Sequence, residues 1–150
     1  DPLTARNRLL DAINRGQRAI NYAGHGNVDS WRGGLFSSQD VNSLTNRGSL
    51  SVFIMMTCLN GYFHHAQIDS LAELLMKAEN AGAVAVWASS GVTFPSDQGV
   101  MSIEMFRSLF DAKSSWTMGE MTQRARSAAL NKDVRLTWIL LGDPTTRIKR

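Results

Sequence analysis

Two segments of this 150-residue chain are apolar without alternation, Val52 to Thr57 (VFIMMT) and Ala83 to Ser89 (AVAVWAS). A half-exposed strand alternates apolar and polar residues, whereas a strand covered on both faces reads as a continuous apolar run. Between them, the capping box Ser70-Leu71-Ala72-Glu73 opens a predicted helix that runs to about Asn80. This order of strand, helix and strand predicts a mainly parallel sheet with right-handed crossovers.

The remaining segments continue the α/β pattern. Asp1 is placed to cap a first helix, Pro2 suits its first turn, and Gly16 suits its end. Two apolar stripes at helical spacing are expected to pack in the core: Leu3, Leu9, Leu10 and Ile13, and Met101, Met105, Phe106, Leu109 and Phe110. The other expected elements are strands at Ala19–Ala23 and Leu136–Gly142, a short helix near Gln39–Leu44 inside the loop Asn27–Ser49, and a helix from Thr117 to about Leu130. We therefore expect an α/β fold of about four strands, flanked by helices on both faces.

Length and composition limit the function classes. The 150 residues suit a single domain, 1–150, and no apolar run approaches the roughly 18 residues of a membrane-spanning helix. The formal charge of +3 is spread along the chain, and only the tail Arg147–Arg150 is locally basic, so nucleic-acid binding is weakly supported. The single cysteine excludes an internal disulfide.

The beginning of the chain suggests that it is part of something longer. It starts with Asp1 rather than Met and has no leader, which is typical of a processed product or an excised segment. About four strands are few for a doubly wound sheet, and the chain opens on a helix. We therefore expect the domain to lack its first strands, which would belong to a preceding segment.

Reactive side chains follow two of the predicted strands. Cys58 comes directly after the strand at Val52–Thr57, and His25 after the strand at Ala19–Ala23. A lone cysteine is usually a small core residue, but ligands and catalytic groups of parallel sheets gather outside the carboxyl ends of the strands. An imidazole beside a thiol removes the proton that otherwise keeps the thiol a poor nucleophile. Gly26 lets a substrate approach the backbone closely, and the amides of Gly26 and Cys58 are candidate donors for an oxyanion hole.

Five strings, taken together and in order, resemble the gingipain-type cysteine peptidases of the caspase-like clan: NYAGHGN, MMTCLNGYF, SLAELLMKA, GAVAVWASSG and LLGDPTTRI. The resemblance covers roughly Ala19 to Ile148. It implies a caspase-like fold in which Cys58 is the nucleophile and His25 is the general base and acid. Some relatives also place an acidic residue beside the histidine. Here Asp29 is close to His25 in sequence and is the candidate for that acid. The alternatives are that Asp29 is a solvated loop residue and that a backbone carbonyl or a missing N-terminal segment orients the imidazole.

The resemblance also implies a pocket for the residue before the scissile bond. Its walls would come from Thr57 and from Ser89 to Phe94, including Ser90, and from Trp87, for which a core position is the alternative. Gingipains cut after Arg or Lys, and the acid that would pair with such a residue here is Asp97. Trp31 and Phe36 either wall the cleft or pack in the core. His64 and His65 make no zinc spacing with Cys58, so we expect no metal and no cofactor.

The sequence therefore predicts a cysteine endopeptidase that acts on polypeptides through a thioester acyl-enzyme. Two alternatives stay open: an inactive or truncated caspase-like scaffold for binding or assembly, and a small-molecule binding domain in which Cys58 is core. Resemblance implies an extracellular or cell-envelope location in a bacterium. If strands are missing, the open sheet edge is a site for self-association.

Overall fold

The computed structural model describes residues 1–111, 113 and 115–148, so Lys149 and Arg150 of the basic tail lie outside the described residues. The elements in chain order are α1 (Pro2–Asn14), β1 (Ala19–Ala23), the 3₁₀ turn η1 (Arg32–Gly34), α2 (Ser38–Val41), β2 (Ser51–Met56), α3 (Leu71–Lys77), β3 (Ala83–Ser89), α4 (Pro95–Phe110), α5 (Met118–Ala128), α6 (Lys132–Thr137) and β4 (Trp138–Gly142).

Within the described residues the strands form one four-stranded sheet in the order β1-β2-β3-β4. The pairs β1–β2 and β2–β3 are parallel, and β4 runs antiparallel to β3. The prediction of a mainly parallel sheet is confirmed. Ala23 of β1 lies opposite Met56 of β2, so the carboxyl ends of these two strands are level.

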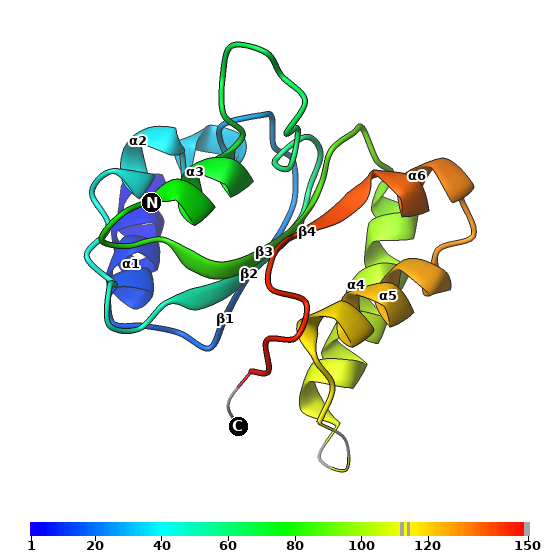
Figure 1. The fold of residues 1–150 in the computed structure, drawn as a ribbon. Helices are drawn as coiled ribbons and strands as arrows, with labels where there is room; N and C mark the ends of the chain where they lie inside the picture. Colours follow the sequence, from blue (N-terminus) through cyan, green and yellow to red (C-terminus); the bar gives the residue numbers. More distant parts are fainter. Residues whose placement is uncertain (112, 114, 149–150) are drawn as a thin grey trace.

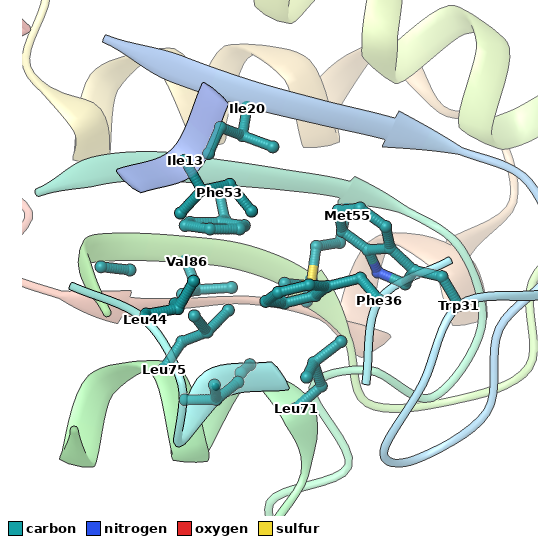
Figure 2. Packing of buried hydrophobic residues seen from close by; sticks show 14 residues of the cluster. Ile13, Ile20, Trp31, Phe36, Leu44, Phe53, Met55, Leu71, Leu75 and Val86 are labelled. Carbon is teal, nitrogen blue, oxygen red and sulfur yellow. The ribbon is translucent and has the colours of Figure 1, made fainter. Parts of the chain in front are cut away.

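Helices cover both faces of the sheet, as expected, and Figure 1 shows α1 and α3 on one side and α4 and α5 on the other. Alternate residues of the fully buried strand β2 point to opposite cores. Phe53 and Met55 join the core under α1 and α3, which Figure 2 draws. Ile54 and Met56 join the core under α4 and α5.

The helix starts follow the predicted caps. Asp1 accepts hydrogen bonds from the amides of Leu3 and Thr4, and Ser70 and Thr117 each form a capping box with the glutamate three residues on. The predicted end of α3 is wrong, because the backbone turns extended at Ala78 rather than near Asn80.

The carboxyl-terminal prediction is corrected in part. Leu136 and Thr137 belong to a short helix, α6, capped by Asn131, and the strand begins only at Trp138. Leu136 is 62% exposed, so its apolar side chain did not mark a buried strand. Two members of the predicted apolar stripes also differ, since Leu3 is 61% and Phe110 75% exposed at the ends of their helices.

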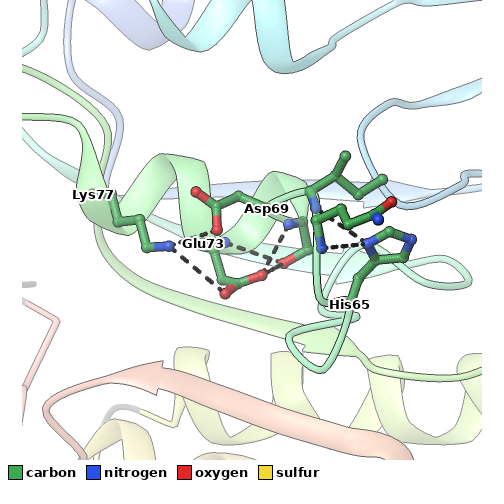
Figure 3. A network of polar contacts seen from close by, with 7 residues as sticks. His65, Asp69, Glu73 and Lys77 are labelled. Carbon is green, nitrogen blue, oxygen red and sulfur yellow. Dashed lines mark hydrogen bonds and ion pairs between the residues drawn. The ribbon is translucent and has the colours of Figure 1, made fainter.

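A polar network holds the connection between β2 and α3 (Figure 3). Nδ1 of His65 accepts hydrogen bonds from the amides of Gln67 and Ile68 at 3.2 and 3.1 Å. Lys77 donates to Asp69 at 2.6 Å, and this hydrogen bond raises the pKa of the lysine. The end of the loop that follows Cys58 is thereby tied, through Asp69, to the last residue of α3.

Candidate active site

Cys58 and His25 follow neighbouring strand ends. The amide of Gly24 donates to the carbonyl of Met56 at 3.1 Å, which extends the β1–β2 pairing to the residue before His25. Beyond β2 the chain turns sharply at Leu59. Its backbone φ is 62°, a value that residues other than glycine rarely adopt. Both reactive side chains thus leave the sheet at the same edge.

The backbone at Gly26 packs closely against Thr57, the residue that follows β2. A Cβ at Gly26 would lie 2.4 Å from Oγ1 and 3.3 Å from Cγ2 of Thr57, and 3.1 Å from the carbonyl of Ser30. Thr57 is fully buried, and its Oγ1 has no hydrogen-bond partner among the described residues. Only glycine therefore allows the two strand ends to approach this closely.

We expect Gly26→Ala to separate these strand ends. The alanine Cβ meets a buried, β-branched side chain that has no room to move, so the free energy of unfolding should fall by about 1–3 kcal/mol, as measured by urea denaturation. The double variant Gly26→Ala/Thr57→Ala should recover part of the loss. Gly48→Ala is the matched control, because a Cβ there meets nothing within 4 Å. Equal effects at the two glycines would contradict the close packing.

The thiol of Cys58 is half-buried and contacts Thr93, which follows β3. The amide of Thr93 donates to Sγ at 3.4 Å, while the carbonyl and hydroxyl oxygens of Thr93 lie 3.6 and 3.7 Å from the sulfur. Nε2 of Gln98 in turn donates to the Thr93 hydroxyl at 2.6 Å. Cys58 is thus neither enclosed in the core nor isolated from polar groups.

The loop that carries His25 is well fixed, while the imidazole is exposed. The carbonyl of His25 accepts hydrogen bonds from the Tyr22 hydroxyl at 2.8 Å and from the Arg32 amide at 2.9 Å. Among the described residues no hydrogen bond reaches the imidazole, from Cys58 or from an acid. Asp29, the predicted acidic neighbour, is exposed and contributes backbone hydrogen bonds to Asn27 and Ser38 instead.

The N–H groups of Gly26 and Cys58, both in half-buried residues, have no acceptor within the part of the chain that the structure describes, and the same holds for the amides of His25 and Asn60. Buried backbone donors are nearly always paired, so a donor left free beside a nucleophile is available to a ligand. A cavity of about 510 Å³ opens beside Gly26, lined by His25, Gly26 and the loop that runs to Gly34, and Cys58 is not among its lining residues.

The residues predicted to form the substrate pocket have different surroundings. Trp87 is fully buried and packs against Trp138 at 5.7 Å between ring centroids, which is the core position of the two alternatives. The hydroxyls of Ser89 and Ser90 bond to Thr137. Asp97 is half-buried in the first turn of α4.

Trp31 and Phe36 both pack in the core, and Trp31 also lines the cavity beside His25. Trp31 stacks on Tyr22 with 4.2 Å between ring centroids, and Phe36 is completely buried. His64 and His65 are exposed. The described residues contain no group of three His, Cys, Asp or Glu side chains able to hold a metal ion. Among those residues, no helix is both long and apolar enough to cross a membrane.

Sequence reasoning missed two residues of this site, Asn60 and Gln98, whereas Thr93 lies in the segment Ser89 to Phe94 that was expected to wall the pocket. The dipeptide Asn60-Gly61 is typical of a turn, yet the Asn60 side chain is fully buried. Thr93 and Gln98 lie five residues apart across the start of α4, and no short motif links them to Cys58. Only the position of Asn60 just after the cysteine was a usable signal.

Comparison with known proteins gives a consistent result. The sequence model described as Peptidase family C25 matches residues 3–149. Gingipain R2 and Gingipain R1 of Porphyromonas gingivalis are each 34% identical to this chain over 94 residues, which is 60% of this chain and 13% and 9%, respectively, of those two proteins.

Solved structures agree in fold. The complex of the Porphyromonas gingivalis RgpB pro- and mature domains has a TM-score of 0.85 and 26% identity over 96% of this chain, and the Arg specific cysteine proteinase gingipain R has 0.82 and 28% over 96%. A structure described as a protease matches 92% of this chain at 18% identity and a TM-score of 0.83. This chain spans about 37%, 36% and 37% of these three structures. The fold is therefore that of the caspase-like gingipains.

Proposed function

The chain belongs to peptidase family C25, and we propose that it supplies the nucleophile and the general base of a cysteine endopeptidase. Cys58 attacks the carbonyl carbon of a peptide bond while His25 accepts the thiol proton. His25 then gives that proton to the leaving amine as the C–N bond breaks, leaving a thioester. Water, deprotonated by His25, hydrolyses the thioester and restores the free thiol.

The observation that carries this proposal is the level pairing of two strand ends. The Gly24–Met56 hydrogen bond and the contact of Gly26 with Thr57 hold the two loops side by side. Each loop contributes one reactive side chain and at least one amide that has no acceptor among the described residues. In the absence of substrate the thiol contacts Thr93, and catalytic hydrogen bonds are often formed only in the substrate complex.

The free amides of Gly26 and Cys58 are proposed as the oxyanion hole. The carbonyl oxygen of the scissile bond gains negative charge in the tetrahedral intermediate, and donors fixed in advance stabilise that charge without reorganising. Neither amide has another acceptor among the described residues, so binding the oxyanion breaks no existing hydrogen bond.

The relatives also support proposals on the substrate preference and the cellular location of this protein. A neighbour is described as Arg specific, and a carboxylate would explain such a preference by charge pairing. Asp97 is our candidate for that carboxylate, with Thr57, Ser89 and Ser90 forming the adjoining wall.

We further propose that 1–150 is one peptidase domain, that a preceding segment completes its sheet and orients His25, and that the protein acts outside a bacterial cell or at its envelope.

The first test measures alkylation of Cys58 by iodoacetamide against pH, by intact-mass spectrometry. The chain has one cysteine, so each mass shift reports on Cys58. We expect fast alkylation at neutral pH and a profile that moves to higher pH in His25→Ala, because an imidazole no longer takes the thiol proton.

His64→Ala is the matched control, since His64 is an exposed histidine six residues after Cys58. It should leave the profile unchanged. If His25→Ala and His64→Ala both behave like the wild type, the Cys58–His25 pair is wrong, and the inactive scaffold becomes the better description.

A further inference from the structure

Asn60 is fully buried and lies two residues after Cys58. Its side chain points away from its own loop and into the one that follows His25. Nδ2 donates to the carbonyl of Asn27 at 2.6 Å and to that of Ser30 at 3.5 Å, and Oδ1 accepts from Nε1 of Trp31 at 2.9 Å. The N–H₂ and C=O groups of the side-chain amide thus all form hydrogen bonds with a single segment, residues 27–31.

The backbone of Asn60 is held from the opposite side. Its carbonyl accepts from the amide of Ala72 in α3 at 2.9 Å, and the next amide, that of Gly61, donates to Ser89 of β3 at 2.8 Å. Asn60 therefore has a fixed position relative to the sheet, and through its side chain it fixes the neighbouring loop. An aspartate would lack the two donors, and a leucine would leave both carbonyls without this partner.

Residues 27–31, to which the Asn60 side chain bonds, directly continue the loop that carries His25 and Gly26. Asn27 directly follows Gly26, and the amides of Asn27 and Arg32 close the loop on Ser30 and His25 with hydrogen bonds of 3.0 and 2.9 Å. A shift of residues 27–31 would therefore move both His25 and the Gly26 amide. Displacements of about 1 Å in a catalytic group are enough to lower rates by about 100-fold.

We propose that Asn60 is a positioning residue that sets the distance between the His25 loop and the Cys58 thiol. This inference rests on the proposed function, because it requires that His25 act on Cys58. It adds a role for a side chain that touches neither reacting group. The proposal has a specific consequence: replacing Asn60 should change the reactivity of the Cys58 thiol only by displacing His25.

The test is a double-mutant cycle read by the rate of Cys58 alkylation at pH 7. Asn60→Ala should slow alkylation by at least about tenfold, approaching the rate of His25→Ala. In the His25→Ala background, Asn60→Ala should produce no further change, since the pair is already lost. Circular dichroism checks that each variant is folded.

Asn46→Ala is the matched control. Asn46 is also buried, and its side-chain amide also both donates and accepts: it donates to the carbonyl and accepts from the amide of Gly82 at 2.9 Å each, but it lies away from His25. It should lower stability while leaving the alkylation rate within about twofold. If Asn60→Ala does not fold, Trp31→Phe removes one of the three hydrogen bonds and should slow alkylation in the same direction by a smaller factor.

Two outcomes overturn the inference alone: His25→Ala slows alkylation but Asn60→Ala does not, or Asn60→Ala slows it equally in both backgrounds. If His25→Ala itself leaves the rate unchanged, the proposed function fails and the inference falls with it. The single variants therefore distinguish the two failures.

Discussion

Replacing His25 with alanine in the complete protein is expected to lower kcat/KM for peptide hydrolysis by at least about 10⁴-fold, as is replacing Cys58 with alanine. Each change removes a member of a pair that acts as a unit, because the thiol needs a base to take its proton, and without the thiol no thioester forms for the base to act on. The double variant should therefore be scarcely worse than either single one. The measurement is hydrolysis of a panel of peptidyl amides that differ in the residue before the scissile bond.

The panel also tests specificity. If Asp97 supplies the pocket carboxylate, Asp97→Asn should reduce hydrolysis after Arg and Lys more than hydrolysis after uncharged residues. His64→Ala again serves as the control and should retain activity. A His25→Ala protein that keeps more than about a tenth of the wild-type kcat/KM would rule out His25 as the general base.

Phe53→Ala is expected to lower the free energy of unfolding by about 3–5 kcal/mol. Phe53 lies in the middle of β2, is completely buried, and stacks on Phe36 at 6.1 Å between ring centroids under α1 and α3 (Figure 2). Truncation removes the ring and leaves a cavity between sheet and helices. Since domains are stable by only about 5–15 kcal/mol, the loss should be plain in urea denaturation followed by circular dichroism.

Phe110→Ala provides the same chemical change without the cavity. Phe110 is 75% exposed at the end of α4, where it stacks on Phe106 at 6.0 Å. Its truncation should change the free energy of unfolding by no more than about 0.5 kcal/mol. Similar losses for the two variants would mean that the core under α1 and α3 is not packed as described.

The sequence was a good guide to the elements whose signals are local. The cap at Asp1 and the capping boxes at Ser70 and Thr117 all start helices, because a side chain only two or three residues away satisfies the first amides. The unbroken apolar runs gave strands buried on both faces. By contrast, α6 went unseen because the apolar residue Leu136 points to solvent, which depends on tertiary packing.

The candidate site divides in the same way. Local sequence patterns were enough to predict that Cys58 and His25 follow strand ends and that a glycine accompanies the histidine. Three contacts were seen first in the folded chain: Thr93 contacts the thiol, Gly26 packs against Thr57, and Asn60 bonds to the loop after His25. Such contacts join residues about thirty positions apart, and their geometry is set by how the strands pair and how the loops pack, which no local pattern encodes.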